Sequence, residues 1–328
     1  MLKHVVNQVV IERRLPDLAC HYSSAPLFHV AGMMYVLGGI VRGHSSLILP
    51  AFDTVRTLGW LQSGEVTGCF LVPTMIRSLV DHPQVIEGRY DRLHSIAYGA
   101  APMLPALLRK AIDIFACDFI NMFGAGTEAG LQTVLTPADH RLALEGHEYL
   151  LESIGRPAMG IDLRLVDHDM KDVRRGTVGQ IVTRANAVMS GYLSQPEETA
   201  KVFADGWFCG GDMAWEDGDG YLFLSGRKRD MIIRGGENIY PIEIEIVLED
   251  LPGVTEVAVV GRPDDYWGEI VRAHVVLEDG SSLSAGDLRA HCVARLAKYK
   301  VPAEFRLERG LPKNASGKIL KRELRLWP

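Results

Sequence analysis

The sequence has few cysteines and no motif that would pair them. Five cysteines occur among 328 residues, no two are in CxxC spacing, and even the nearest pair, Cys69 and Cys117, is widely separated. Zinc sites and disulfide frameworks need closely or regularly spaced cysteines, so both kinds of site are disfavoured. Buried or incidental thiols in a reducing compartment fit this pattern, and we therefore expect a cytoplasmic protein.

A long hydrophobic run is also missing. The longest weakly polar stretch, residues 26–41, contains His29 and three glycines and is shorter than the roughly 20 residues that a membrane helix requires. Near the amino terminus, Glu12, Arg13 and Arg14 stand where a signal peptide has its apolar core or cleavage site. The sequence therefore predicts neither a membrane span nor secretion.

Neither sign of charge dominates. Lys and Arg number 35 against 41 Asp and Glu, for a net charge of -6, and both signs occur along the whole chain without an acidic or basic tail. A protein that coats nucleic acid is usually basic, so we expect no nucleic-acid partner. The hydrophobic fraction of 47% excludes a largely disordered chain. The oligomeric state stays open, a homo-oligomer included.

What the sequence does have is alternating helix and strand patterns, over a length that suits about two domains. Residues 1–116 alternate short apolar strands with amphipathic helices, which is α/β patterning. From Leu163 the elements shorten and alternate between turns, which indicates a smaller antiparallel unit. The expected elements are strands at 45–49, 68–72, 163–166, 178–183 and 221–224 and helices at 74–80 and 105–115.

The final part of the chain reads as a separate α+β lobe. Pro241 suits a first helical turn, although the alternating isoleucines of residues 242–246 fit a strand equally well. The charged stretch 227–230 is the expected linker. We thus expect the C-terminal portion of an α/β large domain, with a small antiparallel β unit, at residues 1–228 and a small mobile α+β C-terminal domain at residues 229–328. Further elements of this lobe are strands at 256–260 and 272–277 and a helix with Leu288, Cys292 and Leu296 on one face.

Glycine is frequent, at 33 of 328 residues, and it gathers beside polar residues in short segments. Six such segments are PLFHVAG at 26–32, YGAAP at 98–102, FGAGTE at 123–128, GWFCGGD at 206–212, GR at 226–227 together with GGEN at 235–238, and PKNASGK at 312–318. In this order the set resembles the adenylate-forming superfamily, specifically the acyl-CoA synthetases, which are AMP-dependent synthetases and ligases. Each segment alone is a weak match, but six in order make chance agreement improbable.

The resemblance implies a two-step reaction. A carboxylate attacks the α-phosphate of ATP to give acyl-AMP and pyrophosphate, and the thiol of coenzyme A then displaces AMP. Because the first step concentrates negative charge, it needs Mg²⁺ and fixed donors around the phosphates. Thr127 would donate a hydroxyl to a phosphate oxygen, and Glu128 would bind the metal through a hard carboxylate oxygen. Taken alone, these two residues would instead suggest the start of a helix.

The same resemblance assigns the nucleotide contacts. Asp212 would accept hydrogen bonds from both ribose hydroxyls, and Arg227 would hold the ribose and phosphate. Taken alone, these residues are a turn aspartate and a solvated arginine. Adenine would lie against flat backbone with an aromatic ring on its other face, although a plain tight turn explains the small residues nearly as well. The residues concerned are Gly99, Ala100, Ala101 and Phe123.

Lys318 is the third expected catalytic residue and the cationic group of adenylation. Ser316 and Gly317 beside it indicate a mobile loop that would deliver its ammonium group to the phosphate and later withdraw it. Without the resemblance, Lys318 would be one more solvated lysine. Arg229 falls where the family has its hinge, usually Asp or Lys, about which the small domain rotates between the two steps.

Two further assignments concern the other substrates. Gly235 and Gly236 resemble the turn beside the pantetheine tunnel of coenzyme A, and a hairpin turn would use the same residues. His29 resembles the residue at the mouth of the acyl pocket, and a satisfied core histidine explains it as well. The identity and chain length of the acid are not determined by these residues.

Three departures from the family pattern stand out. The Ser/Thr/Gly-rich phosphate loop that ends in Pro-Lys-Gly is absent, and residues 1–4 resemble the segment directly after that loop. We therefore expect this chain to be the C-terminal portion of a longer synthetase. It should adenylate poorly as written, since losing one such donor can cost on the order of 10²- to 10³-fold in rate. Residues 123–128 are one residue longer than the usual spacing, and Cys209 and Gly210 replace the usual Arg and Thr.

Two other functions stay open. One is a non-catalytic protein that binds nucleotide or acyl groups, or that pairs with a partner supplying the missing segment. The other is an adenylation enzyme that loads a carrier protein instead of coenzyme A.

Overall fold

A computed structural model describes residues 20–86, 88–314 and 318–327 of the chain. Residues 1–4, Ser316 and Gly317, on which two of the expectations rest, lie outside the described residues. The chain divides into two compact units, Met1–Gly210 with Trp215–Leu224 and Gly211–Ala214 with Ser225–Pro328. The second unit thus comprises residues from Ser225 onward and a short piece of an earlier strand, and the domain boundary at residue 229 stays a prediction.

The first unit is built on a seven-stranded sheet with the order β2-β1-β3-β4-β5-β6-β7. Strands β1 to β5 are parallel, and β6 and β7 extend the sheet in antiparallel fashion. Because β1 lies between β2 and β3, the direction of winding reverses at this point, as in doubly wound α/β folds. The strands are β1 (Cys20–Ser23), β2 (Ser45–Ile48), β3 (Gly68–Leu71), β4 (Ser95–Gly99), β5 (Asp118–Gly126), β6 (Gly130–Leu135) and β7 (Arg156–Pro157).

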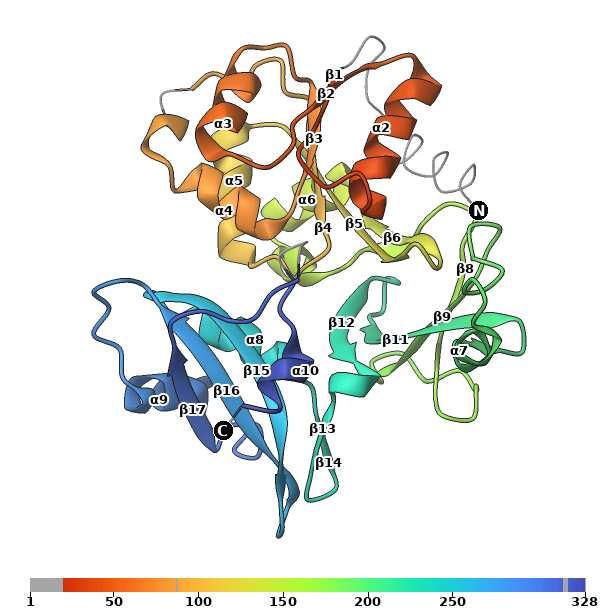
Figure 1. Cartoon of the computed structure of the whole chain (residues 1–328), viewed down its shortest axis with the longest axis vertical. Helices are drawn as coiled ribbons and strands as arrows, with labels where there is room; N and C mark the ends of the chain where they lie inside the picture. The colour runs from red at the N-terminus through yellow and green to blue at the C-terminus, as the bar shows by residue number, and fades with distance from the viewer. Residues whose placement is uncertain (1–19, 87, 315–317, 328) are drawn as a thin grey trace. The chain divides into compact units, whose positions relative to one another are not determined.

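Helices cover both faces of this sheet (Figure 1). On one face, helices α3, α4 and α5 bury Leu58, Ile76 and Leu108 in a single apolar core. On the other face, Tyr35 of α2 packs with Phe70 of β3. Proline opens α4, α5 and α6, a position where its missing N–H costs no hydrogen bond. The helical segments are α2 (Val30–Arg42), α3 (Thr54–Gln62), α4 (Pro73–Val80), η1 (Pro83–Val85), α5 (Pro105–Phe115), α6 (Pro137–Leu144) and η2 (Glu148–Glu152).

A smaller sheet follows, with the order β10-β11-β9-β8 and with β12 beside β11. Its β8–β9 and β10–β11 pairs are antiparallel, as the shortened alternating elements predicted. One of its turns is closed by Asp217, whose Oδ1 accepts hydrogen bonds from the N–H groups of Asp219 and Tyr221. The elements are β8 (Asp162–Val166), β9 (Gly179–Arg184), α7 (Pro196–Lys201), β10 (Phe203–Ala204), β11 (Trp207–Glu216) and β12 (Leu222–Arg227).

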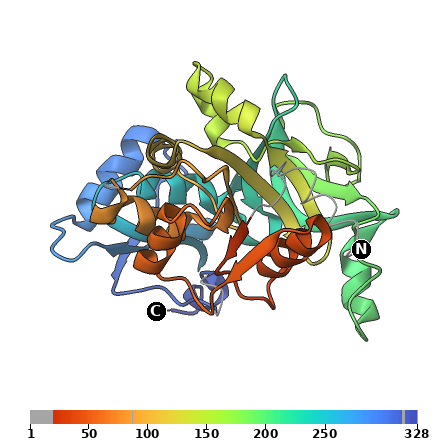
Figure 2. The same cartoon turned by 90° about the horizontal axis from the view of Figure 1, so that it is seen from above.

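The second unit has its own five-stranded sheet, β14-β13-β16-β15, with β17 parallel to β16. Helices α8 and α9 lie side by side on one face of it (Figure 2) and bury Ile244, Leu248, Leu288 and Cys292. On a separate apolar cluster, Leu324 of α10 packs against β15. The elements are η3 (Lys228–Asp230), β13 (Ile232–Arg234), β14 (Glu237–Ile239), α8 (Pro241–Glu249), β15 (Val254–Asp264), β16 (Gly268–Leu277), α9 (Ala285–Arg295), β17 (Glu304–Glu308) and α10 (Lys321–Leu324).

The segment after Pro241 is a helix, which resolves the choice that periodicity left open. Tyr240 has an extended backbone and Pro241 occupies the first helical turn. Ile244 and Leu248, one turn apart, are both fully buried. Among the residues described, no helix combines the length and apolar character needed to cross a bilayer.

Candidate functional site

Three of the predicted segments leave the same edge of the first sheet. They follow β1, β4 and β5, which run parallel, so their carboxyl ends lie at one edge (Figure 1). β1 leads into the segment that contains His29, β4 ends at Gly99, and β5 ends one residue before Thr127. Open α/β sheets bind ligands at this edge, outside the carboxyl ends of their strands.

Glu128 lies in the turn between β5 and β6, and not at the start of a helix as its sequence alone would suggest. Both carboxylate oxygens accept a hydrogen bond from a hydroxyl: Thr127 Oγ1 is 3.1 Å from Oε2, and the Tyr192 hydroxyl is 3.2 Å from Oε1. The N–H of Met189 donates to the Glu128 carbonyl at 2.7 Å and fixes the turn. Within the described ranges Glu128 has no ion pair, so its charge is available to a cation. A half-buried carboxylate with hydroxyl neighbours fits the hard oxygen ligands that Mg²⁺ prefers.

Tyr192 is a contact that sequence reasoning missed. It lies 64 residues from Glu128 in the chain, so no local spacing could have connected them. Its pKa is raised, first by partial desolvation and then by the charge of Glu128, so the phenol keeps the proton that it donates. The backbone N–H of Tyr192 donates to Thr199 Oγ1 at 2.9 Å, which fixes the position of the Tyr192 backbone.

In the loop that begins at the end of β4, Gly99 is tightly packed and Ala100 has a strained backbone conformation. A Cβ at Gly99 would lie 2.3 Å from the carbonyl oxygen of Met122 on β5, so strand packing requires glycine there with or without a ligand. Ala100 has a φ of +66°, in the left-handed region that residues with a Cβ rarely adopt. Ala100 and Ala101 are exposed and Phe123 is half-buried, so small residues leave backbone accessible at this loop.

Buried polar groups anchor the strand that carries this loop. The Tyr98 hydroxyl and His140 Nε2 are 2.9 Å apart, and His140 Nδ1 is 2.8 Å from the Thr136 carbonyl oxygen. Burial lowers the pKa of His140 to about 4, so the ring is neutral near pH 7. Next to it, Asp139 accepts a hydrogen bond from the Tyr221 hydroxyl at 2.7 Å. These groups are enclosed by protein, and we assign them to holding β4 and α6 together.

In the second unit, Asp212 and Arg227 form an ion pair with 3.0 Å between Oδ1 and Nε. Asp212 is only 5% exposed, which is rare for a charged residue without a partner. Burial raises the pKa of its carboxyl, and the positive charge of Arg227, followed by that of Lys318, opposes the shift. The pair therefore keeps a carboxylate in a site from which most water is excluded.

Lys318 lies close enough to this pair for the charges to act on one another. Its pKa is lowered, first by desolvation and then by the positive charges of Arg227 and Arg229. Two hydrogen bonds with Asn314 hold its backbone: the Lys318 N–H donates to Asn314 Oδ1 at 2.9 Å, and the Asn314 N–H donates to the Lys318 carbonyl at 3.0 Å. We call Asp212, Arg227 and Lys318 the charged cluster: the first two form an ion pair, and Lys318 is linked to them through the effect of its charge.

The predicted glycine turn and hinge also belong to the second unit. Gly235 and Gly236, with φ of +58° and +87°, make the turn between β13 and β14. A Cβ at Gly235 would lie 2.7 Å from Trp267 Cε3, so packing against Trp267 favours a glycine at this position with or without a ligand. Arg229 is exposed in η3, directly after the end of β12.

His29 has a local structural role. It precedes α2, and its Nδ1 accepts a hydrogen bond from the N–H of Ala31 at 3.2 Å, which caps the helix. The ring is half-buried. Its placement at the mouth of an acyl pocket stays a prediction.

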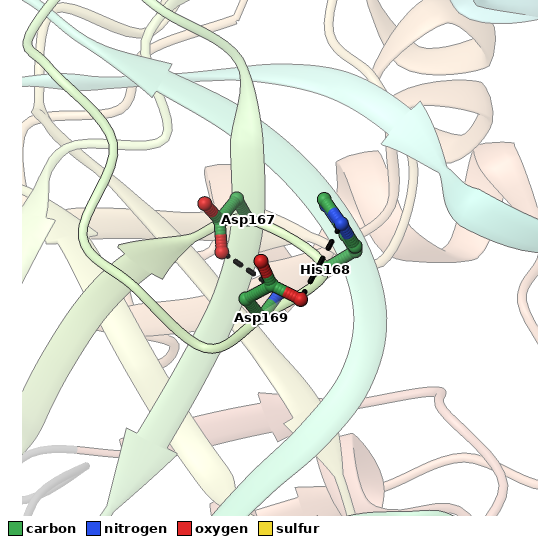
Figure 3. Close-up of side chains that lie close together, drawn as sticks. All are labelled: Asp167, His168 and Asp169. Carbon is green, nitrogen blue, oxygen red and sulfur yellow. Dashed lines mark hydrogen bonds and ion pairs between the residues drawn. The ribbon is translucent and has the colours of Figure 1, made fainter.

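A different group of side chains has the composition of a metal site. Asp167, His168 and Asp169 lie close together in a turn after β8, and all three are exposed (Figure 3). The Asp167 carboxylate already accepts hydrogen bonds from the N–H groups of Asp169 and Lys171, which is what an aspartate does in a solvated turn. This arrangement explains the cluster without an ion.

Comparison with known proteins shows likeness over most of the chain. A model of the AMP-binding enzyme family matches residues 3–193, and a model of the AMP-binding enzyme C-terminal domain matches residues 243–318. Feruloyl-CoA synthase of an Amycolatopsis species is 39% identical over 318 residues, which are 97% of this chain and 63% of that protein. The fatty acid–[acyl-carrier-protein] ligase ScoC of Streptomyces coeruleorubidus is 34% identical over 96% of this chain and 60% of its own.

Solved structures extend the likeness to the fold. The o-succinylbenzoate CoA synthetase MenE of Bacillus subtilis, in complex with its acyl-adenylate intermediate, superimposes with a TM-score of 0.88 at 29% identity. The match covers 99% of this chain and 64% of that one. The chain thus spans a little under two thirds of the length of the proteins that it resembles.

Proposed function

Because the chain belongs to the AMP-binding enzyme family, we propose that it acts as an AMP-forming acid–thiol ligase, an acyl-CoA synthetase. A carboxylic acid, ATP and coenzyme A would give acyl-CoA, AMP and pyrophosphate through an acyl-adenylate. The observation that carries this proposal is the charged cluster of Asp212, Arg227 and Lys318. Such a cluster offers hydrogen-bond acceptors for ribose and positive charge for a phosphate in one place.

In the first step, a carboxylate oxygen of the acid attacks the α-phosphorus of ATP, and the bond to pyrophosphate breaks. Negative charge builds on the phosphate oxygens, so fixed positive charge lowers the barrier. We assign that charge to Lys318 and Arg227, with Asp212 holding the ribose. Thr127 would turn its single hydroxyl proton from Glu128 to a phosphate oxygen, and Glu128 would hold Mg²⁺, which would neutralise phosphate charge.

In the second step, the sulfur of coenzyme A attacks the acyl carbonyl, AMP leaves with the bonding electron pair, and the thiol proton is released. The turn at Gly235 and Gly236 would lie beside the pantetheine arm. Arg229 would be the hinge about which the small domain rotates between the steps. Adenine would contact residues 99–101 and Phe123.

The acid is best sought among hydrophobic carboxylates. His29 leads into the apolar helix α2, whose Met33 and Leu37 pack with buried Met34 and Ala187. The names of the relatives include an aromatic acid and a fatty acid, so a panel of both kinds is the starting point. We place the reaction in the cytosol.

The test separates the two half-reactions. Because the 328 residues contain no Ser/Thr/Gly-rich phosphate loop, we expect the chain to form acyl-adenylate slowly but to convert supplied acyl-AMP and coenzyme A to thioester. Lys318→Ala should lower carboxylate-dependent ATP–pyrophosphate exchange by on the order of 10²-fold or more and leave thioester formation from supplied acyl-AMP intact. Loss of both activities together would contradict the role of Lys318.

A carrier protein is the second candidate acceptor, because ScoC is named as a ligase of fatty acids to acyl-carrier protein. The same supplied acyl-AMP distinguishes the two acceptors. If a phosphopantetheine-bearing carrier is acylated faster than coenzyme A at equal concentration, the carrier is the acceptor. A chain that binds AMP in calorimetry but uses neither acceptor would be a non-catalytic nucleotide-binding protein.

A further inference from the structure

The end of the chain contacts the expected hinge. Arg325, the C-cap residue directly after α10, donates a hydrogen bond from its guanidinium to the backbone carbonyl of Arg229 at 3.1 Å. The same guanidinium is 3.5 Å from the carboxylate of Asp230. One side chain therefore holds two successive residues of η3 at the point where rotation is proposed.

Helix α10, which directly precedes Arg325, is held in place by a buried side chain and an ion pair. Leu324 is fully buried in an apolar cluster with β15, and Lys321 pairs with Glu245 at 2.6 Å. Glu245 in turn accepts a hydrogen bond from the Val259 N–H at 2.6 Å, which connects α10, α8 and β15. Helix α10 is thus attached to the sheet by contacts that do not involve Arg325.

The hinge segment is held less firmly. Lys228 and Arg229 are exposed, and η3 has no side-chain hydrogen bond at its start. A backbone hydrogen bond from the Met231 N–H to the Arg227 carbonyl, at 3.1 Å, closes this short turn. Rotation about the backbone of Arg229 turns its carbonyl, so a donor on that carbonyl favours one setting of the hinge.

The charged cluster of Asp212, Arg227 and Lys318 indicates which conformation of the hinge is favoured. Asp212 and Arg227 precede Arg229 in the sequence and Lys318 follows it, yet all three belong to one compact unit. Bringing a residue from beyond the hinge to the ribose carboxylate is what the first half-reaction needs. The second half-reaction needs the Gly235 turn there instead.

We propose that Arg325 is a positioning residue that braces the hinge at Arg229 and Asp230 in the setting that brings Lys318 to Asp212 and Arg227. The brace must break before the small domain rotates for thioester formation. This inference rests on the proposed two-step function and adds to it the residue that biases the two settings. Both contacts are made by one guanidinium nitrogen, Nη2, which lies 3.1 Å from the carbonyl oxygen of Arg229 and 3.5 Å from the carboxylate of Asp230.

The test compares Arg325→Ala with Lys321→Met. Each removes one charged contact of the α10 segment, but only Arg325 touches the hinge. The first readout is protection of the hinge, measured by amide hydrogen exchange over residues 227–232 and by the rate of tryptic cleavage after Lys228 and Arg229. We expect Arg325→Ala to raise the rate of hydrogen exchange and the rate of tryptic cleavage by about fivefold each. Arg325→Lys should raise the two rates less, and Lys321→Met should leave them unchanged.

The second readout is catalytic, and the inference predicts opposite changes in the rates of the two half-reactions. Release of the brace should speed thioester formation from supplied acyl-AMP and coenzyme A by up to about fivefold and slow acyl-adenylate formation, since the population shifts away from the first setting. A merely unfolded variant would slow both. Unchanged hinge protection in Arg325→Ala, or an equal rise in Lys321→Met, overturns the inference. If the wild-type chain makes no thioester, the proposed function fails, and hinge protection alone then decides the role of Arg325.

Discussion

Two carboxylates of this protein hold their charge by opposite means. Glu128, in a turn of the first unit, has only hydroxyl partners, from Thr127 and Tyr192, among the residues that the structure describes. Asp212, in the second unit, is 5% exposed and paired with a guanidinium at 3.0 Å. One carboxylate stays available to a cation from outside, and the other is already neutralised by the protein.

The difference indicates what each carboxylate can bind. A hydroxyl donor leaves the net charge of a carboxylate intact, so Glu128 can still attract a divalent ion. An arginine cancels that charge, so Asp212 is left to accept hydrogen bonds from neutral groups such as ribose hydroxyls. Residue type alone, Glu in one case and Asp in the other, does not reveal this division.

The largest effect is expected when the uncompensated charge is removed. Glu128→Gln should lower acyl-adenylate formation by on the order of 10²-fold, because the amide cannot replace a charged metal ligand. The measurement is the initial rate as a function of Mg²⁺ concentration. Glu145→Gln, at the exposed end of α6, is the matched control and should behave as the wild type. Equal rates in Glu128→Gln and wild type would remove Glu128 from the metal site.

An intermediate effect is expected from Asp212→Asn. Loss of a charged acceptor should weaken AMP binding by about tenfold, measured by calorimetry. The exposed turn variant Asp205→Asn serves as the control and should bind AMP as the wild type does. Unchanged AMP affinity in Asp212→Asn would contradict a ribose contact.

The difference in stability between the wild type and Asp212→Asn should depend on pH. Burial raises the pKa of Asp212 above its ordinary 3.8, so the folded state binds this proton more tightly than the unfolded state. The stabilisation from that proton is present below pH 3.8 and is lost as pH rises through the raised value. The free energy of unfolding of the wild type, relative to Asp212→Asn, should therefore fall as urea titrations move upward from pH 3.8. A rise in that difference would mean that Arg227 outweighs burial.

The smallest effect is expected at Tyr192. Tyr192→Phe removes one hydroxyl hydrogen bond from Glu128 and leaves the ring, so adenylation should fall by only about two- to fivefold. The apparent affinity for Mg²⁺ should change more than the rate at saturating metal, because the contact of the phenol is with the Glu128 carboxylate. A loss as large as that of Glu128→Gln would place Tyr192 itself among the catalytic groups.

Much of the fold could be predicted because local rules and packing agree. Helix α5 runs from Pro105 to Phe115 as expected, since proline at the first turn and a one-sided apolar pattern mark the same element. The segment after Pro241 was ambiguous because Ile-Glu-Ile-Glu-Ile satisfies two periods at once. Burial of Ile244 and Leu248 against the sheet decided it, and that depends on distant residues.

The candidate site divides in a similar way. Residues within short motifs, such as Glu128 and Asp212, could be named from the sequence by resemblance. Contacts across the chain could not: Tyr192 reaches Glu128 over 64 positions, and Arg325 reaches Arg229 over 96. The alternative that Thr127 and Glu128 begin a helix is excluded, because the next strand, β6, pairs back onto β5 immediately after the turn.

Ala100 shows how the loop after β4 is maintained. Its left-handed backbone is unfavourable by roughly 1–2 kcal/mol for a residue with a Cβ, so the loop does not adopt this shape by its own preference. Ala100 directly follows Gly99, whose place beside Met122 is fixed by the register of β4 and β5. When heat or denaturant loosens that edge of the sheet, this loop should relax before the rest of the core, and nucleotide affinity would then be lost ahead of global melting.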